Sequence, residues 1–308
     1  PGIYAGLDFK YSDYTRRTGL DSTQAKGTEK YNGTWLTGGL FNVDDSALFN
    51  FDANAKICLL GDYIGNFEIQ GFIKQYFNKN KSSYIQANAL IQSKAVNPFF
   101  SGYIGNHDIW KTDFKDTKTI NIEGRYVNKK SRTELGVGWS NIIDYVYFDT
   151  TAMPQQTSKA LIVLTAWGKQ VFKAGHFRFD QTLYFQKSTQ KEILSLPALS
   201  LYSHNYYENA FFNKVLKFII GIDLFYNTKF YADNYSPSTM QFYNQRKEKT
   251  GGYPKLDVFL DIRIKRADFF LKYEHLNYYF TNGEYFSALD YPINPAMFKF
   301  GLKWNFYN

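Results

Sequence analysis

The sequence predicts an all-β fold, a transmembrane antiparallel β-barrel of about fourteen strands with short periplasmic turns and long extracellular loops. Three observations support this fold class. Apolar and polar residues alternate in one segment after another, short and long connections join the segments in turn, and charged residues stay on one face of each segment. Successive side chains of a strand point to opposite faces, so each such segment has one apolar and one polar face.

The last segment, Phe298–Phe306, shows the alternation most clearly. Its five large apolar residues stand two apart, and lysine, glycine or asparagine separates them. About ten residues of this pattern match the length of a transmembrane strand. We expect the apolar face to contact lipid, Lys299 and Lys303 to face water inside, and the segment to close the barrel.

The same period recurs along the whole chain. The strongest alternation lies in residues 3–10, 49–59, 216–224 and 256–265. Weaker candidate strands cover 31–43, 66–77, 84–93, 117–127, 132–143, 160–172, 175–186, 193–204 and 268–277. With the last segment, these candidates give about fourteen strands, an even number that places both ends of the sheet on one side of the membrane.

The connections alternate in length, as the two sides of a barrel require. Short turns are expected near 44–45, 78–81, 128–131, 173–174 and 266–267, and long loops near 12–30, 94–116, 144–159, 232–253 and 278–297. Three connections depart from this rule. Those near 61–65 and 187–192 are short for their side, and the turn at 205–214 is long. A soluble Greek-key sandwich gives no reason for such alternation, so the pattern favours a membrane barrel.

Charged residues of the candidate strands fall on the face opposite the apolar one. The residues expected to face the lumen are Asp52, Lys56, Glu68, Glu123, Arg125, Arg178, Asp180, Asp223, Asp257, Asp261, Arg263, Lys265, Lys272, Glu274, Lys299 and Lys303. A lysine or arginine at the bilayer midplane costs about 2–4 kcal/mol, so lipid-facing positions must avoid charge. Gln181 is an exception on the outward face, which indicates a bulge or a misplaced strand boundary.

The two signs of lumen charge are nearly balanced, which predicts a water-compatible interior without strong ion selectivity. These charges either brace and solvate the wall or form a track for a substrate. Aromatic residues near the strand ends fit interfacial girdles, whereas loop residues such as Tyr285 and Tyr291 also suit a platform on which sugars stack.

The composition agrees with a barrel and excludes several other classes. Aromatic residues make up 19% of the 308 residues, with 29 Phe and 26 Tyr, yet the mean hydropathy is −0.41. No apolar run approaches the eighteen or so residues of a spanning helix. The net charge of +8 is spread along the chain rather than gathered in a stripe, so we expect no nucleic-acid partner. No secretory signal is visible at Pro1, and we expect one upstream.

No motif points to catalysis, and we expect the protein not to be an enzyme. Cys58 is the only cysteine, and the four histidines lack the spacing of a metal site, so no metal or cofactor is expected. The nearest catalytic candidate, His176 with Asp180 on one strand, is weak because two inward positions separate the residues. Gly136 and Gly138 lie inside a strand and do not form a nucleotide-binding loop.

Several motifs carry a resemblance to a known family. They are the run Gly251–Asn277, the motifs Tyr285-Phe-Ser287 and Tyr291-Pro292, and the closing Phe298–Asn308; Asn97–Phe100, Gly105–Trp110 and Tyr231–Pro237 are looser matches. Together they resemble the "putative porin" family of Bacteroidota outer-membrane proteins, from about residue 47 onward. The resemblance implies a barrel in the cell outer membrane, a pore role and no catalytic residues. Family members are longer at the N-terminus, so residues 1–308 are expected to form a single barrel domain that is the C-terminal part of a longer precursor.

Two functions remain open from the sequence. The first is a porin-like channel for passive diffusion of small hydrophilic solutes. The second is a non-conducting barrel that serves as a scaffold subunit of an outer-membrane complex for secretion, assembly or lipoprotein binding. The expected partners are the lipid bilayer with its lipopolysaccharide, the outer-membrane assembly machinery, and other outer-membrane proteins. The assembly machinery is expected to recognise Trp304, Phe306 and Tyr307. A soluble glycan-binding sandwich is a third, weaker alternative.

Overall fold

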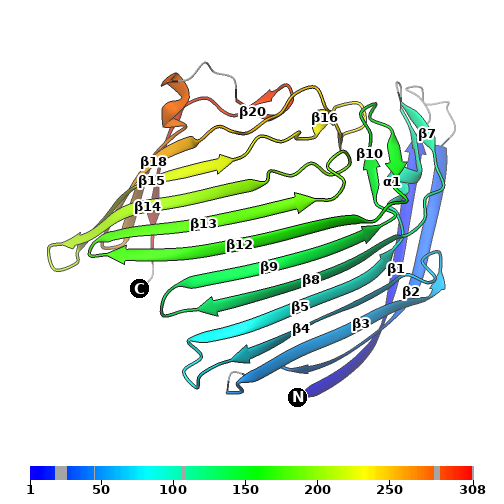
Figure 1. Cartoon of the computed structure of the whole chain (residues 1–308), viewed down its shortest axis with the longest axis horizontal. Helices are drawn as coiled ribbons and strands as arrows, with labels where there is room; N and C mark the ends of the chain where they lie inside the picture. Colours follow the sequence, from blue (N-terminus) through cyan, green and yellow to red (C-terminus); the bar gives the residue numbers. More distant parts are fainter. Residues whose placement is uncertain (18–25, 45, 106–107, 281–284, 307–308) are drawn as a thin grey trace.

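The computed structural model describes residues 1–17, 26–44, 46–105, 108–280 and 285–306, and one antiparallel sheet of fourteen strands dominates it (Figure 1). Each strand pairs with the next main strand along the chain, which confirms the predicted strand number and topology. In sheet order the strands are β1 (Gly2–Arg17), β2 (Lys26–Asn42), β3 (Phe49–Gly61), β4 (Phe67–Tyr76), β5 (Ser83–Lys94), β8 (Thr117–Asn128), β9 (Thr133–Ile143), β12 (Leu161–Ala174), β13 (Phe177–Ser188), β14 (Leu199–Phe211), β15 (Leu216–Asn227), β18 (Lys255–Ile264), β19 (Ala267–Glu274) and β22 (Met297–Trp304).

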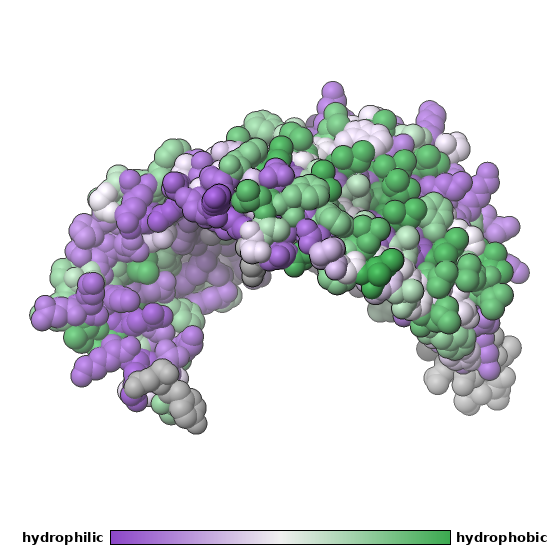
Figure 2. Space-filling model, turned by 90° about the horizontal axis from the view of Figure 1, so that it is seen from below, coloured by the Kyte–Doolittle hydropathy of each residue, from purple (hydrophilic) through white to green (hydrophobic). Residues whose placement is uncertain are grey.

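The sheet curves into an arc that is open on one side (Figure 2). β1 pairs only with β2, and β22 pairs only with β19, so the outer edges of these two strands have no strand partner within the described residues. The expectation that the last segment closes a barrel is therefore wrong for this structure. β22 is one edge of an open sheet.

Short and long connections occupy opposite ends of the strands, as the sequence predicts. The short turns lie at the end where both chain termini are found (Figure 1). Two predicted boundaries were wrong. β14 runs from Leu199 to Phe211 rather than over 193–204, so the supposedly long turn at 205–214 shrinks to residues 212–215. β1 and β2 also extend far into the predicted loop at 12–30.

The two faces of the sheet differ in chemistry. Large apolar side chains that are well exposed, among them Ile57, Ile122, Leu164 and Phe300, belong to one face. Hydrophobic residues spread over much of the convex side of the arc (Figure 2), so this apolar face is the convex one and the other face is concave. A sheet that is apolar outside and polar inside is the arrangement of a membrane barrel wall.

Gln181 lies on the convex face without any bulge, so both explanations offered by the sequence are wrong. The register runs unbroken through the position, with Gln181 opposite Gln170 on one side and Ser203 on the other. The Gln181 side-chain amide donates to Asn205 Oδ1 at 2.8 Å, and Asn205 donates to Ser203 Oγ at 2.7 Å. The three polar side chains satisfy one another in the middle of an apolar surface.

The long connections carry short secondary elements. These are α1 (Pro98–Ser101), β6 (Gly102–Ile104), β7 (Ile109–Lys111), β10 (Val146–Phe148), β11 (Pro154–Gln156), β16 (Asn234–Ser236), β17 (Gln241–Tyr243), the 3-10 helix η1 (Leu276–Phe280), β20 (Phe286–Ala288) and β21 (Tyr291–Pro292). Among the described residues, no helix has the length and apolar character needed to cross a bilayer.

Candidate functional site: the concave wall

The concave face of the sheet gathers the charged side chains that the sequence assigns to a lumen. The register places these predicted residues on this face: Asp52, Lys56, Glu68, Glu123, Arg125, Arg178, Asp180, Asp223, Asp257, Asp261, Arg263, Lys272, Glu274, Lys299 and Lys303. Lys265 is different, because it lies in the turn between β18 and β19. Convex-face charges such as Lys118 and Lys187 stand near the long-connection ends of their strands.

The densest charge cluster lies where β15, β18 and β19 meet. Asp223 of β15 and Asp257 of β18 are directly opposite each other on adjacent strands, and both are buried. Lys272 Nζ lies 3.4 Å from Asp223 Oδ2 and 3.1 Å from Asp257 Oδ2. Lys255 Nζ adds a second cation 3.2 Å from Asp257, and His204 Nδ1 lies 2.5 Å from Asp223. The two like charges can stay side by side only because these groups neutralise them.

Other ion pairs link neighbouring strands along the wall. Lys299 pairs with Glu274 at 2.8 Å, and both were predicted from the sequence. Three acidic partners, Asp8, Glu208 and Asp268, were missed. The structure pairs Lys56 with Asp8 at 3.0 Å, Arg178 with Glu208, Arg263 with Asp268, and Arg125 with Glu134 at 3.9 Å. Glu208 and Lys255 escaped prediction because β14 extends beyond its expected end and β18 begins one residue earlier than expected.

A column of aromatic rings runs down the concave wall from the long-connection end. We define the aromatic column as Tyr184, Tyr202, His204, Phe225 and Phe259, which β13, β14, β15 and β18 supply. The ring centroids of Tyr202 and Phe225 are 4.8 Å apart, and those of His204 and Phe259 are 5.0 Å apart with planes at 8°. The aromatic column was not predicted, because alternation shows which face a residue occupies but does not show that inward aromatic rings gather in one place.

Glycine allows some of these rings to lie flat against the wall. A Cβ on Gly221 would stand 2.5 Å from the Phe259 ring and 2.5 Å from the Asn205 carbonyl oxygen, so only glycine fits there. Gly136 accommodates Trp167 on β12 in the same way. A ring that covers a cross-strand glycine packs without rising far from the sheet.

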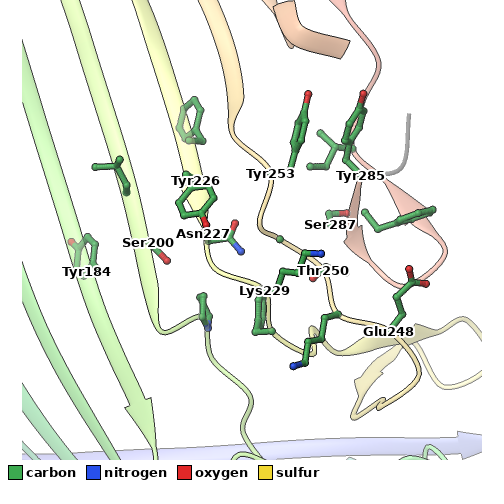
Figure 3. A pocket seen from close by; sticks show the side chains of 18 of the residues that line it. Tyr184, Ser200, Tyr226, Asn227, Lys229, Glu248, Thr250, Tyr253, Tyr285 and Ser287 are labelled. Carbon is green, nitrogen blue, oxygen red and sulfur yellow. The ribbon is translucent and has the colours of Figure 1, made fainter. Parts of the chain in front are cut away.

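A cavity of about 690 Å³ opens at the top of the aromatic column (Figure 3). Its wall comes from Tyr184, Ser200 and Asn227 of the sheet and from Tyr253 and Tyr285 of the long connections. Figure 3 shows the rings of Tyr253 and Tyr285 side by side; their centroids are 4.1 Å apart, with planes at 27°. The volume falls within the range of small-molecule sites.

His275 braces the far side of this cavity. It is completely buried, and its backbone N–H donates to Asp257 Oδ1 at 2.9 Å. Its Nδ1 lies 2.8 Å from the Asn294 carbonyl oxygen, which can only accept, so Nδ1 carries the proton. Nε2 then accepts from the Tyr253 hydroxyl at 2.9 Å. The histidine thus joins the charge cluster of the wall to the cavity ring of Tyr253.

The long connection 95–116 folds across the concave face. It leaves β5 and returns to β8, yet its strand β6 lies against β1, four strands away along the sheet. A second cavity, of about 680 Å³, lies between β1 to β5 and residues 95–98 of this connection. The connection therefore lies over part of the concave face at β1 to β5.

An aromatic core makes connection 95–116 compact. Trp110 is buried, stacks on Tyr103 with centroids 4.6 Å apart, and donates from Nε1 to the Phe99 carbonyl oxygen at 3.1 Å. Phe148 of β10 packs against Trp110, so a second long connection shares this core. The Tyr103 hydroxyl donates to the Ser238 carbonyl oxygen at 2.7 Å, which ties in a third.

The structure also locates the predicted catalytic pair and two of the three residues of the predicted assembly signal. His176 lies in the exposed turn between β12 and β13, where Nδ1 is 3.0 Å from the Glu208 carbonyl oxygen rather than near Asp180. Trp304 ends β22 and Phe306 follows it, and both side chains are exposed; Tyr307 lies outside the described residues. Within the described part of the chain, no group of three His, Cys, Asp or Glu residues could hold a metal ion.

Solved structures with a similar fold are outer-membrane receptors. A double mutant of the ferric enterobactin receptor PfeA from Pseudomonas aeruginosa matches with a TM-score of 0.68 and 12% identity, over 97% of this chain and 50% of the receptor. The siderophore receptor PirA from Acinetobacter baumannii matches with a TM-score of 0.64 and 11% identity, over 98% and 52%. The chain spans about half the length of these receptors. Among curated proteins, no sequence matches the chain.

The fold and the concave polar wall define a protein of the outer-membrane β-barrel class. The sequence family is more specific. The family model described as "Putative porin" matches residues 2–308, and the chain belongs to that family. The predicted family, fold class and outer-membrane location are thereby confirmed, whereas the receptors at about 12% identity show the fold alone.

Proposed function

We propose that the protein is a channel for the passive diffusion of small hydrophilic solutes. The observation that carries this proposal is the separation of the two faces: charges of both signs line the concave wall, many of them in ion pairs, and the convex face in its middle is free of charge within the described strands. A wall that carries both signs of charge stays hydrated, and the charges already held in ion pairs bind a passing ion only weakly. No covalent step is part of the function.

Connection 95–116 supplies the constriction of this channel. It covers the concave face of β1 to β5, and its aromatic core around Trp110 keeps it from moving aside freely. The solutes that pass are therefore selected by the width left beside this connection.

Single-channel recording in planar bilayers tests the proposal. The purified, folded full-length protein is expected to give stable openings whose conductance rises in proportion to salt concentration. Folding is checked separately by the heat-dependent shift of the band in gel electrophoresis. Folded protein that gives no openings would contradict the diffusion channel.

One observation favours the scaffold as a second candidate. Gln181, Asn205 and Ser203 place hydrogen-bonding groups in the middle of the convex apolar face, where polar side chains commonly mark contacts between membrane proteins. If the protein is a scaffold, its purification in mild detergent should yield an outer-membrane partner in a stoichiometric amount. The double variant Q181L/N205L would lose that partner, whereas a pure channel would be recovered alone in both forms.

A further inference from the structure

We propose that the top of the aromatic column binds sugar rings, so that neutral oligosaccharides are the solutes this channel favours; the inference rests on the proposed diffusion function and names its substrate class. The site consists of the cavity of about 690 Å³ and the rings of Tyr184, Tyr202 and Phe225 beneath it. Two of these rings also contact the charge cluster: Lys255 Nζ lies 5.4 Å from the Phe225 ring centroid, and the Tyr202 hydroxyl lies 3.5 Å from Asp223 Oδ1.

The rings are accessible. Tyr184, Tyr202 and Phe225 keep 41%, 37% and 39% of their surface exposed, on the face of the sheet that otherwise carries charge. Apolar surface left in water is unfavourable until a ligand covers it. The negative face of an aromatic ring attracts the weakly positive C–H groups of a pyranose, which form flat apolar patches on both sides of the sugar.

Neutral hydrogen-bonding groups lie beside the rings. The register aligns Tyr184 with Ser200 and Ser200 with Asn227, so a hydroxyl and a carboxamide continue the row that begins with the Tyr184 ring. Tyr202 and Phe225 form the next row down. A ligand with apolar faces and a rim of hydroxyl groups matches such alternation of rings and polar side chains.

The wall charges just below the rings are already paired, whereas Lys229, Glu248 and Lys249 line the upper part of the cavity. Asp223 and Asp257 below the cavity are held by Lys272, Lys255 and His204. An anionic ligand would have to compete with two buried carboxylates for the same cations, and a cationic ligand would have to displace those cations. A neutral ligand does neither, so the electrostatics favour a sugar over an anionic aromatic solute.

The upper side of the cavity is rigid before any ligand arrives. Tyr253 is held by its hydrogen bond to buried His275, and Tyr285 donates from its hydroxyl to the Tyr278 carbonyl oxygen at 2.8 Å. Ordered side chains lose little entropy on binding, which favours affinity.

Channel blockade by maltohexaose, a neutral linear oligosaccharide, tests the inference. With the full-length protein in a planar bilayer, maltohexaose on the long-connection side is expected to cause transient, concentration-dependent interruptions of current. The double variant Y202A/F225A should weaken this block about tenfold, since it removes two of the three rings on which the sugar stacks. The variant Y202F keeps the ring, so maltohexaose should block its channel as strongly as that of the parent protein.

Two controls give the test its specificity. Phe179→Ala removes a ring of similar exposure from the convex face of β13 and should leave the block unchanged. Poly(ethylene glycol) of the same mass lacks pyranose faces and should block far more weakly. Open channels that maltohexaose does not interrupt, equal block by both polymers, or equal block of Y202A/F225A and parent would each overturn the sugar inference while leaving the diffusion channel intact.

A protein without conductance would contradict the diffusion channel instead. Titration calorimetry of maltohexaose with the detergent-solubilised protein would then decide the sugar site by itself. Heat of binding that Y202A/F225A abolishes and Y202F retains supports the site, and absence of binding overturns it.

Discussion

Lys272 contacts both buried carboxylates of the charge cluster, whereas Lys255 and His204 contact one each. The Lys272 ammonium bridges two buried carboxylates that face each other, those of Asp223 and Asp257. Removal of one member of a buried ion pair leaves an uncompensated charge, which is far more costly than the pair is worth.

We therefore expect Lys272→Gln to destabilise the folded protein by about 3 kcal/mol, near the lower limit for a broken buried pair because Lys272 is partly exposed. The free energy of unfolding in urea, followed in lipid vesicles, measures the loss. Lys299→Gln is the matched control on the adjacent strand. Its ion pair with Glu274 is more exposed, so the loss should stay below about 1 kcal/mol. Equal losses in the two variants would contradict the bridging role.

Asp149 makes one long connection sensitive to acid. Burial would raise the pKa of this carboxyl, but donation from the Thr151 hydroxyl at 2.6 Å, from the Thr151 and Met153 amides and from Gln155 outweighs burial and lowers the pKa below its usual 3.8. A lowered folded-state pKa means that the stabilisation is complete above the unfolded value and disappears as the pH falls through the folded one.

The β10–β11 hairpin that contains Asp149 should therefore open at acid pH while the strands stay folded. Amide hydrogen exchange at Ala152 and Met153, corrected for the intrinsic effect of pH, is expected to accelerate between about pH 5 and pH 2. Asp149→Asn lacks the titrating charge and should exchange fast at every pH. Exchange that stays slow in the parent protein down to pH 2 would refute this account.

At the scale of the strand, glycines facing aromatic rings decide local packing. Gly221→Ala would push a methyl group against both the Phe259 ring and the Asn205 carbonyl oxygen. We expect a loss of about 1–3 kcal/mol, the usual cost of overpacking, measured by urea unfolding in vesicles. Gly124→Ala, also within a central strand, meets no atom within 4 Å and should change stability little. A smaller loss for Gly221→Ala than for Gly124→Ala would disprove the steric argument.

Connection 95–116 should limit conductance. Replacement of residues 97–113 by a short Gly-Ser linker removes α1, β6, β7 and the Trp110 core but leaves β5 and β8 intact. Single-channel conductance is expected to rise at least about twofold, because the replaced segment covers the concave face of β1 to β5. An equivalent replacement within the 285–293 segment, on the other side of the arc, is the control. Unchanged conductance after the first replacement would place the constriction elsewhere.

Strand alternation made most of this architecture predictable. A strand in a membrane must segregate its faces, so period-two patterns found all fourteen strands and many of the charges of the concave wall. The predicted boundaries of β14 were wrong because its ends mix tyrosine and asparagine, and these residues suit either face of a strand near the membrane interface. The Gln181 cluster could not be predicted either, since hydrogen bonds between outward side chains of adjacent strands follow from register and not from alternation.

For the whole molecule, the paired charges predict weak discrimination between cations and anions. With a KCl gradient across the bilayer, the reversal potential should lie close to zero. K272Q should shift it toward cation preference, because the substitution leaves unmatched carboxylates on the wall. A strong selectivity in the parent protein would show that unpaired charges line the narrowest part of the path.

The unequal heights of the two sheet edges shape how solutes reach this wall. β1 has sixteen residues and β22 has eight, and β2 continues beside β1 past the end of its pairing with β3. About ten residues suffice to cross the bilayer, so some six residues of β1, or about 20 Å of strand, project beyond the lipid on the long-connection side. The strands themselves are therefore tall at β1 and β2 and short at β19 and β22, where the connection with η1, β20 and β21 stands above the strands and lines the aromatic cavity. In the proposed channel, solutes that enter on this side pass between that connection and the rings of Tyr184, Tyr202 and Phe225.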